Sequence, residues 1–440
     1  MNEKRKIIII CNDFPPHKSV GAQRPAAWCK YFDFQEYEIH VFCRKWLENF
    51  RSPSDYFRNN PCLPDISFFE NATIHYCDFI PNWRDRLILI NKNNQIIKII
   101  QKFLTLVYFV FPFFFSNLDS TRKIYHTARK FILMSNNIFF IIATGEPFIT
   151  FLYAKKLSKE FNIRWCADYR DGWSLNYGVQ FMPFLQRILL RTFIRRIETN
   201  LVQTARVVVT VNDLLAQKLE KLHKRKVYVV QNGFWEEDFI DIDSEGNEKY
   251  LFNSNKFIIS YSGSLYPYQP IEDFFSFFLF FLERYNLNSQ EFEFHFWGTK
   301  GVLERLKDFK DNKTPKIICH PKLPRKELII NLSRSHLLLF LSSDKIDGSA
   351  VKIYDYFALR RPIFVFKNDH ASIEKLINQT RIGFLHNNSE LSGLYLKNLY
   401  KSYKLHEKGS FVTNPSNLHI YSRKHQTDIL QKILEENVGG

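Results

Sequence analysis

The chain has 440 residues, of which 45% are apolar and 24% are charged. This composition excludes disordered, collagen-like and fibrous proteins. The 61 Lys and Arg outnumber the 45 Asp and Glu, which gives a formal net charge of +16. Such an excess attracts negative partners, so nucleic acid, anionic lipid and phosphorylated substrates are all candidates. At roughly 150 residues per domain, the length indicates two or three domains.

Seven cysteines are scattered along the chain without the paired spacing of a zinc site or a disulfide framework. Buried thiols in a reducing compartment are therefore expected. The longest uncharged stretch, 103–118, has 16 residues and contains Pro112. Because a spanning helix needs about 20 apolar residues, we expect no transmembrane segment, and we recognise no signal peptide.

Short apolar runs recur along the chain, separated by stretches with helical spacing. We expect strands at 7–11, 39–43, 73–76, 139–143, 165–169, 207–211 and 227–230, and then at 257–262, 292–297, 316–319, 337–341 and 362–366. Continuous apolar runs are typical of parallel strands that are buried on both faces. The alternation of strands and helices predicts an α/β fold, and about twelve strands fit two open sheets better than one.

The boundary between the two sheets is expected in the polar stretch 236–255, which holds seven acidic residues. Two helices have clear signals. Asp213 is a candidate N-cap for a helix with leucines at helical spacing. Near the C-terminus, 421–435 reads as a helix with Ile429, Ile433 and Leu434 on one face.

The loop after the first strand, 12–24, is a candidate ligand site. Loops at the carboxyl ends of parallel strands bind ligands in α/β proteins. Gly21, close to the start of a helix, permits close backbone approach to a phosphate. A plain tight turn is the alternative, because the spacing is neither that of a dinucleotide-binding GxGxxG nor that of a P-loop.

The segment Asp168-Tyr169-Arg170-Asp171-Gly172-Trp173 follows another expected strand. Three charges at the end of a buried strand are costly unless they are paired or used. The segment therefore indicates a functional site, with a structural Asp–Arg pair as the alternative.

In the second half, Gly263 and Gly298 each end an expected strand, and the segment from Asp347 to Asp355 carries the strongest signal. If it is a loop entering a helix, 348–351 present free N–H groups and Lys352 supplies a cation. Amides and a cation suit a diphosphate, and the carboxylate of Asp355 suits a sugar diol. A solvated helical turn is the alternative.

Basic residues gather beside apolar ones. Between 84 and 130, nine basic residues and two acids surround the uncharged stretch 103–118. In 181–197, Arg187, Arg191 and Arg195 share one helical face, with Arg196 adjacent. A solvated face and a face toward anionic lipid are both open. For 103–118 a phenylalanine-rich core is the competing explanation, because 273–283 (DFFSFFLFFLE) uses Phe in a helix that is expected to be buried.

Several motifs stand in the order seen in a known family. They are the FPP…G..R loop that ends at Arg24, the DYRDGW segment, QNGF at 231–234, SGSL at 262–265, and the D-x7-D segment with KIYDY and a later RPI. Together they resemble the retaining glycosyltransferases of family 4, which have the GT-B fold. The most similar subset is the bacterial polysaccharide transferases with a D-x-R-D-P-W motif.

The resemblance implies two Rossmann-like domains that face each other across a cleft. Residues 1–235, joined by a C-terminal helix within 418–440, would bind the acceptor, and 236–417 would bind the nucleotide-sugar. Catalytic roles fall on Asp168, Arg170 and Asp171 at the acceptor side and on Asp347 near the donor sugar. The donor would be held by Gly21, Arg24, Gly263, Gly298, Lys322, Gly348 and Ser349, by Lys352 at the diphosphate, and by Asp355 at the ribose.

The chain departs from the family pattern at four places. Asp347 and Asp355 stand where the family has Glu, which is one methylene longer. Gly172 replaces the Pro of the subset motif. The basic residue often found after the Gly263 strand is missing, since 266–269 reads YPYQ; Lys300 or Lys322 is expected to compensate.

The function implied is metal-independent, retaining transfer from a UDP- or GDP-linked sugar, with no further cofactor. The acceptor would be a polyprenyl-diphosphate-linked glycan in capsule, O-antigen or exopolysaccharide synthesis. We expect a cytoplasmic protein attached peripherally to the anionic inner face of the plasma membrane, and no nucleic-acid partner, because no such motif appears. A nucleotide-sugar epimerase of the same fold and a non-catalytic membrane- or polyanion-binding protein remain as alternatives.

Overall fold

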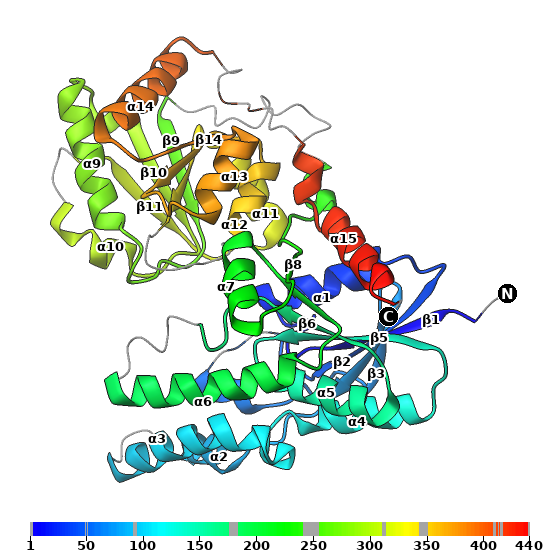
Figure 1. Ribbon diagram of the computed structural model, residues 1–440. Helices are drawn as coiled ribbons and strands as arrows, with labels where there is room; N and C mark the ends of the chain where they lie inside the picture. The colour runs from blue at the N-terminus through cyan, green and yellow to red at the C-terminus, as the bar shows by residue number, and fades with distance from the viewer. Residues whose placement is uncertain are drawn as a thin grey trace. The chain divides into compact units, whose positions relative to one another are not determined.

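The computed structural model describes residues 3–48, 50, 52–90, 95–175, 184–240, 255–309, 314–342, 351–407, 411, 413 and 417–438. The chain divides into two compact units, one formed by Met1–Gln231 with Gln426–Gly440 and the other by Asn232–His425. Each unit has its own sheet with helices on both faces (Figure 1). The prediction of an α/β chain with two Rossmann-like sheets is therefore confirmed.

The sheet of the first unit has eight strands in the order β3-β4-β2-β1-β5-β6-β7-β8. The bounds are β1 Arg5–Ile10, β2 Tyr37–Arg44, β3 Ile66–Phe69, β4 Ala72–Cys77, β5 Ile138–Gly145, β6 Trp165–Tyr169, β7 Val207–Thr210 and β8 Tyr228–Val229. Only β3 pairs antiparallel, with β4, among these described strands. It was not predicted because its side chains alternate between exposed and half-buried, whereas the expected strands are continuously apolar.

The helices of this unit are α1 Val20–Tyr31, α2 Trp83–Ile90, α3 Gln95–Val110, α4 Arg122–Leu133, α5 Ile149–Phe161, α6 Phe184–Val202 and α7 Asp213–His223, with 3-10 turns η1 Pro53–Phe57, η2 Phe111–Phe113 and η3 Ser116–Leu118. Helices α4 to α7 share one core with β1, β5, β6 and β7, and α1 lies on the other side of the sheet (Figure 1). The N-cap of α7 is Asn212, whose side chain accepts from the Leu215 N–H at 2.8 Å. The prediction of Asp213 as the cap was wrong by one residue.

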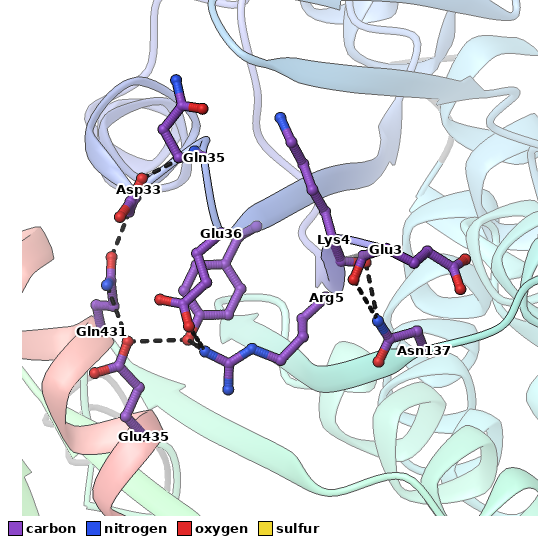
Figure 2. Close-up of polar contacts among 10 residues, drawn as sticks. Glu3, Lys4, Arg5, Asp33, Gln35, Glu36, Asn137, Gln431 and Glu435 are labelled. Atoms are coloured by element: carbon purple, nitrogen blue, oxygen red, sulfur yellow. Dashed lines mark hydrogen bonds and ion pairs between the residues drawn. The ribbon is translucent and has the colours of Figure 1, made fainter. Parts of the chain in front are cut away.

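The C-terminal helix α15 (Arg423–Glu436) follows a 3-10 turn, η9 (Leu418–Tyr421). From Gln426 onward it belongs to the first unit. The Tyr37 hydroxyl donates to Glu435 at 2.9 Å, and the Asp33 N–H donates to Gln431 at 3.1 Å. Figure 2 shows Gln431 and Glu435 pointing toward Asp33 and the N-terminal residues around it. The last helix of the chain thus contacts the segment that leads into β2.

The sheet of the second unit has six parallel strands in the order β11-β10-β9-β12-β13-β14. Their bounds are β9 Phe257–Ser262, β10 Phe292–Trp297, β11 Lys316–His320, β12 Leu337–Leu341, β13 Ile363–Phe366 and β14 Gly383–Leu385. The five predicted strands of this half are present. The sixth, β14, has three residues, too few for a recognisable pattern.

Two apolar clusters sandwich this sheet. On one face it packs against α9 Ile271–Arg284, α10 Val302–Arg305 and α14 Ser389–Lys404, in a core built largely of phenylalanine. On the other face it packs against α11 Arg325–Ser333, α12 Lys352–Ala358 and α13 Ser372–Thr380. Short 3-10 turns complete the unit at η5 Glu236–Asp238, η6 Ser289–Glu291 and η7 Lys307–Phe309.

None of the helices in the described ranges has the length and continuous apolar character needed to cross a bilayer. Cys11, Cys43, Cys77 and Cys166 are free and buried, as their apolar surroundings in the sequence predict. Burial raises the pKa of each of these thiols.

Candidate functional site

A pocket of about 560 Å³ lies at the carboxyl ends of the parallel strands in the first unit. Asp13 follows β1, Trp46 follows β2, Glu146 follows β5 and Arg170 follows β6. Helices α2 and α3 supply another wall through Arg84, Asp85, Thr105 and Tyr108. Because α/β sheets bind ligands at this edge, the pocket is the candidate site of the first unit.

Aromatic rings form one side of this pocket. The His17 ring stacks on Trp46, with centroids 4.6 Å apart. The Arg44 guanidinium lies 3.7 Å from the ring centroids of both Trp46 and Phe79. Burial lowers the pKa of Arg44 to about 10, so Arg44 stays charged at neutral pH.

Four carboxylates line the same pocket, and three of them accept hydrogen bonds from the protein. Asp13 accepts from Ser19 at 3.0 Å, Asp85 from Ser120 at 2.7 Å and Asp119 from Tyr153 at 2.7 Å. The fourth, Glu146, reaches solvent at the rim. The pKa of Glu146 is raised, first because the surrounding protein removes part of its hydration and second because the negative charge of Asp171 acts on it. Its carboxylate is therefore the one most open to a ligand.

Asp168 does not reach this pocket. Its side chain is fully buried and pairs with Arg24 of α1, whose Nη2 donates to Oδ1 at 2.7 Å and whose Nε donates at 3.0 and 3.1 Å. Arg24 also donates to the Val230 carbonyl at 2.8 Å. The pair fastens α1 to the ends of β6 and β8, and in this arrangement neither side chain is open to a substrate.

Arg170 lies at the pocket rim, where its Nε donates to the Gly145 carbonyl at 2.8 Å and its Nη2 donates to the Glu146 carbonyl. Its Nη1 is 4.0 Å from the Asp13 carboxylate. A Cβ added to Gly21 would lie only 1.7 Å from Nη1. The space beside Gly21, where we expected a phosphate, is thus filled by the Arg170 guanidinium. Asp171, the next residue, is exposed.

In the second unit, Gly263, Gly298 and Lys322 follow the neighbouring strands β9, β10 and β11. Thr299 donates to the Gly263 carbonyl at 2.8 Å, and the Gly298 N–H donates to the His320 carbonyl at 3.0 Å. Gly263 has φ +93 with nothing within 4 Å of an added Cβ, so its backbone is open. At Gly298 an added Cβ would lie 3.4 Å from Cα of Lys322. The structure brings these three residues together.

Lys352 begins α12 at the same edge of the sheet. Its Nζ lies 3.8 Å from the ring centroid of Tyr261 and 3.5 Å from the Ser262 carbonyl oxygen. Burial lowers the pKa of Lys352 to about 7. One turn on, the Tyr356 hydroxyl accepts from the Ser262 N–H at 3.0 Å, which holds α12 against the end of β9.

Asp355 lies on the same helix and pairs with Arg325, which donates from Nη1 at 3.0 Å and from Nη2 at 2.7 Å. Arg325 also donates from Nε to Asp238. The other predicted residues of this segment, Asp347, Gly348 and Ser349, lie outside the described residues.

Several side chains at these two edges were missed from the sequence. Asp13, Trp46 and Glu146 would have been found by applying the strand-end rule to every predicted strand. Arg305 had no such signal. From α10 it donates to the Tyr266 carbonyl at 2.9 Å and to the Gln269 carbonyl at 2.7 Å. A cation therefore does reach the loop after Gly263, from forty residues further along the chain.

In the described part of 103–118, four phenylalanines are exposed and lie outside any core, namely Phe103, Phe111, Phe114 and Phe115, whereas Phe113 packs against the core of the first unit. We define the apolar face as the exposed side chains Ile96, Ile99, Ile100, Phe103, Phe111, Phe114 and Phe115. The Phe114 ring lies 5.9 Å from Phe193 of α6, and Arg191, Arg195 and Arg196 of that helix are exposed. The side chain of Arg187 lies outside the described residues. Basic residues and an apolar surface are thus neighbours, as expected.

Among the described residues, no group of three or more His, Cys, Asp or Glu side chains is arranged to hold a metal ion. No protein-family model matches the chain, and no curated protein matches its sequence. Solved structures do match it over nearly its whole length.

Sucrose-phosphate synthase from Thermosynechococcus elongatus has a TM-score of 0.61 at 12% identity, over 98% of this chain and 99% of its own. HepE from Anabaena, in complex with UDP and glucose, has a TM-score of 0.57 at 12% identity, over 98% and 99%. A glycosyltransferase from Rickettsia africae has a TM-score of 0.56 at 12% identity, over 99% of both chains. The chain therefore has the GT-B fold that the resemblance implied.

Proposed function

We propose that the protein is a glycosyltransferase that moves a sugar from a UDP- or GDP-linked donor to a lipid-linked glycan. The observation that carries the donor half is Lys352, held among aromatic rings at the strand ends where Gly263 and Gly298 lie. HepE, which has this fold, is bound to UDP and glucose.

Lys352 is the group we assign to the donor diphosphate. An anion beside a buried lysine favours its charged form, so diphosphate binding would protonate Lys352 when the pH lies near or above 7. In the reaction, the acceptor hydroxyl attacks the anomeric carbon from the side on which the nucleoside diphosphate leaves. The bond from that carbon to the diphosphate oxygen breaks, and the hydroxyl proton passes to the leaving diphosphate. Lys352 then stabilises the charge that develops there, and the configuration is retained without a metal ion.

We assign the other donor contacts from the sequence resemblance. Asp347 would lie near the donor sugar, and the N–H groups of Gly348 and Ser349 would contact the phosphates. Lys322 would contribute a second cation beside Gly298, and Asp355 would meet the ribose. The bound pair Arg325–Asp355 supports a fixed carboxylate at this position.

We assign the pocket of the first unit to the acceptor glycan. Glu146 and Arg170 line it, and the charge of Asp171 acts on Glu146, so all three are assigned to pair with acceptor hydroxyl groups. Trp46, Phe79 and Tyr108 add aromatic surface. Helix α3 lines the pocket with Thr105 and Tyr108 and carries much of the apolar face. A glycan linked to a hydrocarbon chain matches this combination.

The apolar face and the arginines of α6 support attachment to the inner face of the plasma membrane. Each basic residue close to an anionic surface contributes about 1 kcal/mol. The reaction class suits the assembly of capsule, O-antigen or exopolysaccharide on a lipid carrier.

The test is a sugar-transfer assay with a panel of UDP- and GDP-sugars and a polyprenyl-diphosphate-linked acceptor. Lys352→Ala is expected to lower kcat about 10²- to 10³-fold with little change in melting temperature. The matched control is Lys397→Ala, because Lys397 also lies over an aromatic ring, 4.6 Å from the centroid of Tyr285. Near-normal turnover of Lys352→Ala would overturn the assignment.

Two outcomes would replace the proposal. An epimerised nucleotide-sugar formed from donor alone would identify an epimerase of the same fold. No heat of nucleotide binding in calorimetry, together with binding to anionic vesicles, would identify a non-catalytic membrane-binding protein.

A further inference from the structure

Asp355 is fixed in place by an ion pair with Arg325. The family pattern has Glu at this position, and Asp is one methylene shorter. In the structure both oxygens of Asp355 accept from the Arg325 guanidinium, Oδ2 at 3.0 Å and Oδ1 at 2.7 Å. A two-point contact of this kind fixes the plane of a carboxylate as well as its position.

Arg325 is itself held by a third element. It begins α11, and its Nε donates to Asp238 of η5. The Arg325 side chain is one-third exposed and that of Asp355 one-fifth. Burial acts to lower the pKa of Arg325, but Asp355 and Asp238 outweigh it, so the pKa is raised above its ordinary value. The guanidinium therefore keeps its charge.

The hydrogen-bonding capacity of Asp355 is only half used by this contact. A carboxylate has about four acceptor positions, two on each oxygen. Arg325 occupies one on each oxygen, so one on each remains. These two positions lie on opposite outer edges of the carboxylate and point away from each other, so one of them can accept one O–H of a ribose.

We propose that Arg325 is a positioning residue that orients the shorter carboxylate of Asp355 toward the 2′-hydroxyl of the donor ribose, with Asp238 holding Arg325 in place. This inference rests on the proposed function, through the role assigned there to Asp355. It assigns to Asp238 and Arg325 a part in the preference for ribose over deoxyribose.

The experiment measures binding of UDP and 2′-deoxy-UDP, and of GDP and 2′-deoxy-GDP, by calorimetry. Loss of one hydrogen bond to a charged group is expected to weaken wild-type binding about tenfold or more. In Arg325→Gln this ratio is expected to fall to about one, because affinity for the ribonucleotide drops while affinity for the deoxynucleotide is unchanged. Arg325→Lys keeps the positive charge but loses the two-point contact, so its ratio is expected to lie between those of the wild type and Arg325→Gln. The ratio of Asp238→Asn is expected to lie in the same range.

Two further variants separate the possible outcomes. Asp355→Ala sets the baseline without the carboxylate. Arg129→Gln removes another two-point arginine–carboxylate contact, with Glu160 in the first unit, and is expected to keep the wild-type ratio. If Asp355→Ala abolishes the preference but folded Arg325→Gln or Arg325→Lys retains it in full, Arg325 is no positioning residue. If Asp355→Ala retains the preference, the ribose role of Asp355 is wrong and the inference falls with it. If neither ribonucleotide binds the wild type, the proposed donor class itself fails.

Discussion

Helices α9 and α3 are both rich in large apolar side chains, yet one is buried and the other is exposed. In α9, Phe274, Phe275 and Phe278 are at most 1% exposed. In α3, Ile96 and Ile99 are each 67% exposed and Phe103 is 65% exposed. The difference lies in what each helix packs against. Helix α9 faces the aromatic side chains of β9, β10 and β13, whereas α3 contacts mainly α2 and η2.

The charged neighbours of the two helices differ as well. The first turn of α9 carries Glu272 and Asp273, and its arginine pairs with Glu390. The only charged residues of α3 are Lys98 and Lys102. Beyond its end, the Phe114 ring lies 5.9 Å from Phe193 of α6, the helix that carries the exposed arginines. The apolar helix with an acidic first turn covers a sheet, whereas the apolar helix whose charged residues are both lysines is exposed. The apolar composition of the two helices is similar and does not by itself distinguish the buried helix from the exposed one.

The largest expected effect is on folding. Phe278→Ala should lower the free energy of unfolding by about 3–5 kcal/mol, because its ring contacts Phe281, Phe292 and Phe294 at centroid distances of 4.9–5.4 Å. Phe103→Ala should change it by less than about 0.5 kcal/mol. Urea denaturation measures both. Equal losses would mean that α3 is packed as tightly as α9.

The next effect concerns the cations. Replacing Arg191, Arg195 and Arg196 together by Gln should weaken binding to anionic vesicles by up to about 3 kcal/mol, at about 1 kcal/mol each. Binding to neutral vesicles should not change. Vesicle flotation at two salt concentrations measures both, because the electrostatic part is screened by salt. If this variant floats with anionic vesicles as well as the wild type does, the arginines of α6 do not bind anionic lipid.

A single apolar change on α3 should have a smaller effect. Phe103→Ser should weaken vesicle binding by about 1–2 kcal/mol, since insertion at the surface buries only part of a side chain worth about 1.5–3 kcal/mol. The matched control is Phe280→Ser on α9, because Phe280 is the one side chain among the described phenylalanines of that helix that is half exposed. If both variants lose the same affinity for vesicles, then any exposed Phe contributes equally to vesicle binding and α3 has no special role in it.

The last effect is a pH dependence of donor binding, which comes from the burial of Lys352 in the second unit and is at most tenfold per pH unit. Burial lowers the pKa of Lys352 to about 7 in the free protein, and a bound diphosphate would raise it. Below pH 7 the lysine is charged in both states, so affinity for UDP is highest there. Above pH 7 binding must take up a proton, and affinity falls by at most tenfold per pH unit. Calorimetry between pH 7 and 9 measures the slope, which Lys352→Met should abolish.

Strands could be predicted from the sequence because burial on both faces leaves a continuous apolar run. Among the strands that the structure describes, β3, with one exposed face, and the three-residue β14 were missed. Segments rich in charged residues could also be identified from the sequence, but which charged side chains form ion pairs with one another could not. Arg24 meets Asp168 across 144 residues, and Arg325 meets Asp355 across 30. Neither pairing has a local signature. The exposure of α3 was equally hidden, because its composition also fits a core helix.

The position of α15 has a consequence for synthesis on the ribosome. The first unit needs Gln426–Gly440, which follow the whole of Asn232–His425. Leu430 and Leu434 are fully buried, so the surface they cover stays bare until they emerge. At roughly 5–20 residues per second, making the intervening segment takes roughly 10–40 s. The half of the protein that is translated first is thus completed last, and during that interval its uncovered apolar surface is open to chaperones.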